Sequence, residues 1–557
     1  MLLLPIELMA QALSTDTPSI EDYYRREQLL GNIAINFSFV SYPLFPVEAF
    51  QRENLFYPEN TKADFESDSG IEKNIEDKKN LIFKPLPLLW KQELTTHHPE
   101  GINDGAMIPA RGYQTLISTG FFLKYKYLSI KLQPEFVYAA NLDYDGFPNT
   151  REMTGLAHRL WYLYYDKVLN KIDQPERFGN YAYNMAFWGQ SSIRFTYHSL
   201  SLGFSTENLW WGPGMRNSLI MSNSAPGFPH WTLNTVKPIK TGIGSFEGQL
   251  IMGTLKSSGF LPPEHTRNYD GGPAYFIPKR EDDRYLNGMI ISYQPKWIPG
   301  LFIGLIRSFQ LYKGDQGEKL TDYLPVLSSF AEKNREGEEL KFDAYNSLFF
   351  RFVWPKSHIE IYGEYGRSDY FWNARDLILQ PDYSEAYILG FRKLIPLNDL
   401  KKDYLQVHFE ITQLANNTST FLREGGSWGT DAVVRDGYTN QGQLMGAGIG
   451  PGSNLQTVSL SWVKSLREFG IRMERYAHNE DFFFASVEDY RVHWVDISST
   501  LFAHWNYRKF LFSLELKGVV SANYQWDNRF TLEAEEFWDT SYYTYNYQGV
   551  MNIVYRF

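Results

Sequence analysis

The 557-residue sequence predicts an all-β protein: a closed antiparallel transmembrane β-barrel of about 18 strands with a small N-terminal helical portion. Three observations predict it. Aromatic residues make up 17% of the chain, short segments that alternate between apolar and polar residues recur along it, and the last segment ends on Phe557. Strands in lipid must close into a barrel, because an open edge leaves backbone groups without hydrogen-bond partners.

The first residues resemble the end of a secretory signal peptide. In MLLLPIELMAQA, residues 1–12, a short apolar stretch precedes Ala10-Gln11-Ala12, which matches an A-x-A cleavage pattern. We therefore interpret residues 1–12 as the remnant of a signal peptide.

Residues 13–100 are expected to form a periplasmic N-terminal segment with short helices. From Ser19 to Gly31 the sequence has the marks of a helix, since Ser19 can cap its start and Gly31 can end it. The charged stretch from Asn60 to Asn80 lacks the apolar face that a barrel wall needs.

Residues 101–557 are expected to form the barrel, with long loops. Apolar residues recur there at every second position, which is the period of a strand with one apolar face. The clearest examples are LSIKLQPEFVY from Leu128, SIRFTYHSLSLGF from Ser192, HIEIYGEYG from His358, LQVHFEITQL from Leu405 and FLFSLELKG from Phe510. Aromatic residues crowd the strand ends, as they do in the interfacial girdles of such barrels.

The last strand, YNYQGVMNIVYRF, shows which face is which. Its odd positions, from Tyr545 to Phe557, are mostly apolar and are predicted to face lipid. Its even positions include Gln548, Asn552 and Arg556, which are predicted to face the lumen.

Composition excludes several classes of function. The chain has no cysteine, so disulfide frameworks, thiolate nucleophiles and cysteine-based zinc sites are excluded. A net charge of −10 argues against a nucleic-acid partner. No metal site is predicted, because His97 and His98 are adjacent and would point in opposite directions on a regular strand. No cofactor is expected.

Two glycine-rich motifs do not support catalysis. GGSWG, around Ser427, matches the G-x-S-x-G pattern, but no strand-to-helix context surrounds it. GAGIGPG, residues 446–452, lacks the third glycine of a dinucleotide fingerprint and precedes a strand. The prediction is a protein that is not an enzyme, with a barrel hydrolase using Ser427 kept as a third hypothesis.

Residues 208–231, NLWWGPGMRNSLIMSNSAPGFPHW, supply the first candidate ligands for a sugar. Aromatic faces stack on the C–H faces of sugars, while Arg and Asn side chains hydrogen-bond hydroxyl and carboxylate groups. The candidates are Trp210, Trp211, Arg216, Asn217, His230 and Trp231. The alternative is that these aromatic residues belong to an interfacial belt.

A second polar and aromatic cluster contains Arg423 and Asp436 together with three further candidate ligands, Trp428, Asp431 and Arg435. Its charges are too dense for lipid contact, so the cluster is expected to face water or the lumen. The alternative is an ordinary solvated loop.

Several segments, in order along nearly the whole chain, resemble the Wzi family of capsule-assembly proteins in the version found in the Bacteroidota. They are EDYYRREQLLG, THHPEGINDGAMIPARGYQTLISTG, STENLWWGPGMRNS, ISYQPKWIPGLFIGL, YGEYGRSDYFWNARDLILQPDYSEAYILGFRK and GYTNQGQLMGAGIGPGSNLQ. The resemblance implies an outer-membrane barrel with a helical periplasmic portion and a lumen occluded by loops. It also implies a lectin that helps to tether capsular polysaccharide, and no enzymatic activity.

The sequence therefore predicts a lectin-like protein in the outer membrane of a Gram-negative bacterium that binds and tethers capsular or surface polysaccharide during capsule assembly. The expected partners are that polysaccharide, outer-membrane lipid and, during insertion, the barrel-assembly machinery. A porin or saccharide transporter is the alternative.

Overall fold

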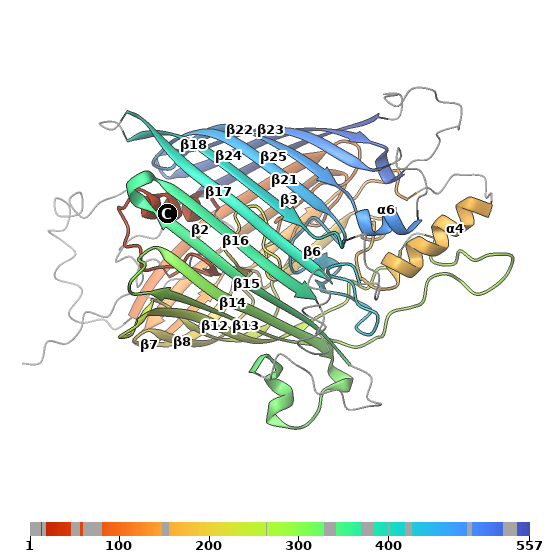
Figure 1. The fold of residues 1–557 in the computed structure, drawn as a ribbon, viewed down its shortest axis with the longest axis horizontal. Helices are drawn as coiled ribbons and strands as arrows, with labels where there is room; N and C mark the ends of the chain where they lie inside the picture. Colours follow the sequence, from red (N-terminus) through yellow and green to blue (C-terminus); the bar gives the residue numbers. More distant parts are fainter. Residues whose placement is uncertain are drawn as a thin grey trace, which may run out of the picture.

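The structure is a computed structural model. It describes residues 13, 18–45, 56–58, 81–147, 155–262, 264–327, 341–368, 384–398, 402–417, 426–486, 493–526 and 543–557. These residues form a closed antiparallel barrel of 18 strands (Figure 1), so the predicted fold class is confirmed. No helix in the described ranges has both the length and the apolar character needed to cross a bilayer.

The wall strands follow one another around the barrel, and β25 closes it by pairing with β2. The short strands β4 and β5 both pair with β3 and occupy one wall position, as β6 and β7 do next to them. The strands are β2 (Leu81–Thr95), β3 (Gly112–Tyr125), β4 (Leu128–Leu132), β5 (Glu135–Ala139), β6 (Tyr183–Phe187), β7 (Ser192–Tyr197), β8 (Leu200–Ser205), β10 (His230–Thr235), β11 (Ile239–Lys240), β12 (Gly244–Leu255), β13 (Arg284–Pro295), β14 (Leu301–Tyr312), β15 (Phe342–Trp354), β16 (Ile359–Ser368), β17 (Glu385–Asn398), β18 (Asp403–Gln413), β21 (Asn454–Lys464), β22 (Arg467–Ala477), β23 (Val495–Tyr507), β24 (Phe510–Ala522) and β25 (Tyr543–Tyr555).

The two faces of the wall differ as the alternation predicts. On β25, Tyr545 and Tyr547 are exposed on the outside, whereas Asn546 is buried inside, and Arg556 just beyond the strand is buried as well. The same strand confirms the prediction that Gln548 faces inward, since it donates a hydrogen bond to Glu93 in the lumen. An apolar outside around a polar inside is the arrangement that a bilayer requires of a barrel.

The connections at the two ends of the barrel differ in length. At one end, here called the short-turn end, residues 126–127 join β3 to β4 and residues 465–466 join β21 to β22. At the other, the long-loop end, residues 140–182, 256–283 and 414–453 are connections. The long-loop end also carries α4 (Gly155–Tyr164), the π-helix η2 (Tyr165–Leu169) and α6 (Glu480–Ser486), seen at the right of Figure 1.

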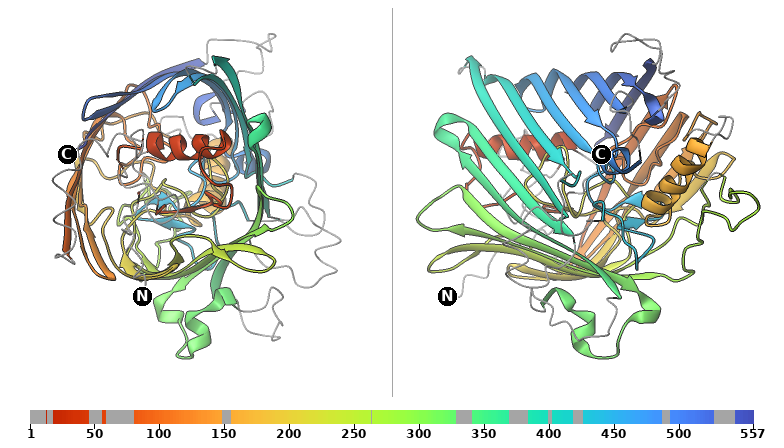
Figure 2. Two further views of the ribbon diagram at one scale, coloured as in Figure 1. Left: turned by 90° about the vertical axis from the view of Figure 1, so that its left-hand side faces the viewer. Right: turned by 45° about the vertical axis from the view of Figure 1, so that its right-hand side comes forward.

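Helix α1 (Pro18–Leu29) confirms the helix expected near Ser19, but it lies inside the barrel (Figure 2, left). Its end packs near the short-turn end, since Leu29 belongs to one buried cluster with Phe302, Val353, Leu394 and Val463. The expectation of a separate periplasmic segment over residues 13–100 therefore needs correction. Residues 1–12 and 60–80 lie outside the described residues.

Strand β2 also corrects the expected start of the barrel at residue 101, because the wall begins at Leu81. Along β2 the exposed positions change from odd numbers, Leu81 and Phe83, to even numbers, Leu88 and Trp90. A register shift between Leu86 and Leu89 causes the change. The bulge hides the period of two from sequence inspection.

Inside the wall lie the described parts of the N-terminal segment and of two long connections, residues 206–229 and 414–453. They form the small sheets β1 (Ser41–Tyr42) with β9 (Trp210–Trp211) and β19 (Thr439–Asn440) with β20 (Gln443–Leu444). Their apolar residues, such as Leu219, Ile220 and Met445, pack in one buried cluster with inward residues of the wall. The remaining short helices are 3₁₀ turns: η3 (Lys313–Asp315), η4 (Leu320–Tyr323), η5 (Pro325–Leu327), η6 (Pro355–Ser357) and η9 (Tyr524–Trp526).

Candidate functional site: a plugged lumen and a pocket at the long-loop end

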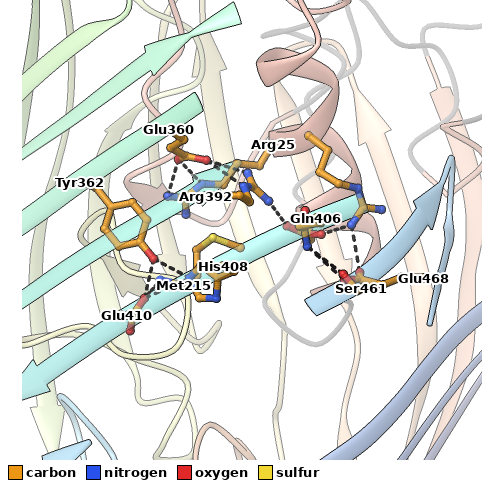
Figure 3. Close-up of polar contacts among 12 residues, drawn as sticks. Arg25, Met215, Glu360, Tyr362, Arg392, Gln406, His408, Glu410, Ser461 and Glu468 are labelled. Carbon is orange, nitrogen blue, oxygen red and sulfur yellow. Dashed lines mark hydrogen bonds and ion pairs between the residues drawn. The ribbon is translucent and has the colours of Figure 1, made fainter. Parts of the chain in front are cut away.

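Helix α1 is fixed in the lumen by buried ion pairs (Figure 3). Arg25 of α1 lies 2.6 Å from Glu360 of β16, and the same carboxylate contacts Arg351 at 2.6 Å and Arg392 at 2.7 Å. Arg392 also lies 2.5 Å from Asp22 of α1. One wall carboxylate is thus surrounded by three guanidinium groups, and one of these comes from the plug.

A second contact fixes the helix at the next residue, Arg26. Arg26 lies 3.0 Å from Glu468 of β22 and also pairs with Asp22. Burial by itself would raise the pKa of Asp22, but the charges of Arg26 and Arg392 hold this pKa below its usual range. Buried charges of this kind are tolerated only when they are paired, so α1 is held by partners that match it.

The lumen segment that follows β9 is anchored on Glu410 of β18. The Glu410 carboxylate accepts hydrogen bonds from the backbone N–H groups of Met215, Arg216 and Asn217 at 2.7 to 3.1 Å. It also accepts one from the Tyr362 hydroxyl at 2.7 Å (Figure 3). Because charge-assisted hydrogen bonds are stronger than neutral ones, this carboxylate fixes the path of the segment across the lumen.

A cavity of about 410 Å³ lies in the lumen beside α1. Charged side chains that already pair with each other line much of it: Lys91 lies near Asp104, Lys517 lies 2.7 Å from Glu100, and Arg472 is paired with Glu515. Trp210 and Arg216 also line it. The cavity suits water or a hydroxyl-rich molecule, and Asp22 and Arg25 of α1 form part of its lining.

A second pocket, of about 220 Å³, lies at the long-loop end. Four aromatic side chains line it, Tyr144, Tyr476, Trp494 and Tyr524, and so do the amides of Gln174 and Gln443. Its remaining polar lining includes His98, Glu100, His478 and Asp496. We call this the aromatic pocket.

Stacked rings fix one wall of the aromatic pocket. The His478 ring lies parallel to Trp494 with centroids 3.7 Å apart, and its other neighbour is Tyr476, also at 3.7 Å. Burial alone would raise the pKa of Glu100, but Lys517 lowers it to about 2, so this carboxylate is ionised at neutral pH. In such a pocket the rings can pack against the C–H faces of a sugar, while the carboxylate and amide groups hydrogen-bond its hydroxyl groups.

The profile of the family described as "Capsule assembly protein Wzi" matches residues 122–511. The chain belongs to this family. The resemblance noted from the sequence is therefore confirmed, and the chain is an outer-membrane β-barrel protein of a Gram-negative bacterium with a place in capsule assembly. No curated protein sequence matches it significantly.

Among solved structures, Escherichia coli Wzi is similar over 99% of this chain and 100% of its own, with 13% identity and a TM-score of 0.59. That protein is described as a carbohydrate-binding β-barrel involved in group 1 capsule assembly. OccAB2 of Acinetobacter baumannii matches with 9% identity over 84% of this chain and 97% of its own, at a TM-score of 0.40. At these identities the likeness concerns the fold alone.

In this Wzi-family barrel, the candidates of the segment 208–231 do not form one site. Trp211 is fully buried and donates from Nε1 to Gln249, and Asn217 is buried against Thr412. His230 is buried on the inner face of β10, whereas Trp231 is exposed on the outer face. Of the six, Trp210 and Arg216 line the lumen cavity, and Arg216 is paired with Glu474 at 2.8 Å.

The second candidate cluster lies between the lumen and the long-loop end. Trp428 is buried and donates from Nε1 to the Leu219 carbonyl. Asp431 accepts backbone hydrogen bonds within its own turn, and Arg435 donates to the carbonyls of Asn170 and Pro278. Arg423 lies outside the described residues. No helix follows Ser427 in residues 426–453, so the nucleophile-elbow geometry is not formed there.

Sequence reasoning missed the residues that hold the plug and those that line the aromatic pocket. EDYYRREQLLG contains Asp22, Arg25 and Arg26, but their partners lie 335 to 442 residues away in the chain. Glu100 and Asp496 are similarly far apart, and each is unremarkable in its own segment. The sequence offered one signal, the adjacent Arg25 and Arg26 on a short predicted helix that also carries Asp22.

Proposed function

We propose that this Wzi-family barrel binds capsular or surface polysaccharide at its long-loop end and so tethers the polymer to the cell. One observation carries the proposal: a pocket lined by four aromatic rings lies at the long-loop end of a lumen that α1 plugs from the other side. The description of Escherichia coli Wzi as a carbohydrate-binding barrel supports it.

The long-loop end is proposed to face outward. Outer-membrane barrels have short periplasmic turns and longer extracellular loops, and the connections of this chain are divided in the same way. Phe557 then lies at the periplasmic end, where the barrel-assembly machinery would meet the last strand during insertion. The exposed apolar residues of the wall, such as Leu348 and Leu501, are proposed to contact outer-membrane lipid.

The proposed mechanism is capture by many weak contacts along a polymer. Once one sugar unit occupies the pocket, its neighbours are held at high effective concentration near the loops, so weak contacts add up. Asp431 and Arg435 are partly exposed at the same end and remain proposed as outer contacts. The proposed role is binding without catalysis.

The test is deletion of the gene followed by complementation with the unmodified gene or with a Tyr524→Ala variant. Deletion should release capsule into the medium without lowering its total amount, and the unmodified gene should restore attachment. Tyr524→Ala should restore it only in part. Capsule that stays fully attached after deletion contradicts tethering.

A porin or saccharide transporter is the second candidate, and the lumen cavity of about 410 Å³ is the observation that favours it. The purified protein in a planar bilayer should show no conductance steps if α1 and the lumen segments block the pore. Steady conductance steps by the unmodified protein would favour transport over tethering.

A further inference from the structure

Three potential metal ligands meet in the wall of the aromatic pocket. His98 and Glu100 lie in the connection between β2 and β3, and Asp496 is the second residue of β23. One ligand atom from each side chain can be chosen so that all three lie within 4.8 Å of one another. The barrel therefore brings together ligands that lie almost 400 residues apart in the chain. The cluster lies outside the plug described above.

The buried side chain of His98 has a free ring nitrogen in the described residues, which indicates that an ion binds there. Its side chain is 3% exposed, and its Nε2 atom has no hydrogen-bond partner among the described residues. Oε1 of Glu100 lies 3.7 Å from this Nε2 atom, which is beyond hydrogen-bonding distance. A buried nitrogen without a partner carries a desolvation cost that a bound ion would remove.

The other ring nitrogen of His98 is already engaged. Its Nδ1 atom lies 3.2 Å from Nδ1 of His97, so in a pair of neutral rings one atom donates and the other accepts. When His98 is the donor, its Nε2 carries a lone pair directed at the carboxylates. Metal-binding histidines commonly have this arrangement, with the second nitrogen fixed by a hydrogen bond.

Neighbouring groups also orient the two carboxylates. Asp496 accepts hydrogen bonds from His478 Nε2 at 2.7 Å and from Trp494 Nε1 at 3.0 Å. Lys517 lies 2.7 Å from Oε2 of Glu100, which leaves Oε1 on the side of His98. Such outer contacts are characteristic of metal sites, where they fix the direction of each ligand.

We propose that His98, Glu100 and Asp496 bind one divalent transition-metal ion, with Zn²⁺ fitting best. Tetrahedral ligands at Zn²⁺ bond lengths lie roughly 3.4 Å apart, close to the 3.7 Å between His98 and Glu100. An imidazole nitrogen favours Zn²⁺ over Ca²⁺, which takes six to eight oxygen ligands. Three protein ligands leave a fourth position, which faces the pocket.

The proposal explains why the sequence predicted no metal site. Adjacent histidines cannot both face one ion on a regular strand, but β2 ends at Thr95, and only His98 supplies a ligand here. His97 serves as the hydrogen-bond partner of the ligand.

The test uses tag-free, full-length protein in detergent, stripped with a chelator and titrated with Zn²⁺ in a calorimeter. We expect one Zn²⁺ per chain, and His98→Gln and Asp496→Asn should each weaken binding at least about tenfold. His493→Gln is the matched control: its Nε2 lies 3.3 Å from Glu480 at the same end, without a third ligand in the described ranges. It should leave the affinity unchanged.

Co²⁺ provides a readout that needs no variant. Bound to the unmodified protein, it should show the intense visible absorption of a four-coordinate site, and Zn²⁺ should displace it. Unfolding curves show whether each variant is folded. The proposal is overturned if the unmodified protein binds no stoichiometric Zn²⁺, or if folded His98→Gln binds it equally well. Neither result depends on polysaccharide binding.

Discussion

At the short-turn end, α1 presents two arginines and an aspartate to wall residues of opposite charge, so these buried groups are paired. At the long-loop end, the aromatic pocket is also lined by polar groups, but one of them, Nε2 of His98, has no hydrogen-bond partner in the described residues. The difference separates two uses of buried polar groups. Matched groups hold the fold together, whereas unmatched groups beside a cavity mark a place for a ligand.

The largest effect is expected from Glu360→Gln, which removes the carboxylate shared by Arg25, Arg351 and Arg392. Three buried guanidinium groups would lose their counter-charge, so the free energy of unfolding should fall by about 3 to 5 kcal/mol. Urea titration followed by tryptophan fluorescence measures the loss. Glu281→Gln, at an exposed loop position, is the control and should change nothing. Equal stability of the two variants would contradict the plug model.

The next largest effect is expected from acid on a second set of paired buried charges, Glu207 with Arg194 and Lys131 of the wall. Burial would raise the pKa of Glu207, but Arg194 and Lys131 lower it from 4.5 to about 2. A lowered carboxyl pKa adds stability that is complete above pH 4.5 and is lost as the pH falls towards 2. The full loss is roughly 3 kcal/mol, and it should show in urea midpoints measured across this range.

Glu207→Gln should flatten that pH profile while lowering stability at pH 7. Glu176 at the long-loop end offers the contrasting case, because burial raises its pKa. Glu176→Gln should keep the loss of stability between pH 4.5 and 2. A profile that flattens equally in both variants would remove the distinction between the two regions.

A smaller effect is expected on polysaccharide binding. Tyr524→Ala removes one ring from the aromatic pocket and should weaken binding of the native capsule by about 0.5 to 1.5 kcal/mol. Trp231→Ala removes an equally prominent ring from the outer wall and should leave the affinity unchanged. If Trp231→Ala weakened binding more than Tyr524→Ala, the binding site would lie in the segment 208–231 that the sequence suggested.

The smallest effect is expected from Arg216→Lys. Arg216 makes a two-point contact with Glu474, at 2.8 and 3.2 Å, that lysine cannot reproduce. Stability should fall by at most about 1 kcal/mol, and capsule affinity should not change. A loss of affinity without a loss of stability would show that Arg216 contacts the polymer.

The wall could be predicted from sequence because lipid imposes a local rule. On β25, every second residue must be apolar, and thirteen residues are enough to see it. On β2 the same rule is hidden by one bulge, so the barrel begins earlier than predicted. The lumen follows no such rule. Arg25 meets Glu360, and His98 meets Asp496, only through the closed barrel, and no local pattern records these pairs.

The distance between α1 and its partners also constrains the order in which the molecule assembles. Arg26 cannot meet Glu468 until a further 442 residues of the chain have been made. Until then its charge stays in water, which favours a helix waiting outside the unfinished wall. When β25 pairs with β2, the side of the wall is closed, so α1 can then enter only through an end of the barrel. Seating of the plug is therefore expected to complete the fold rather than to begin it.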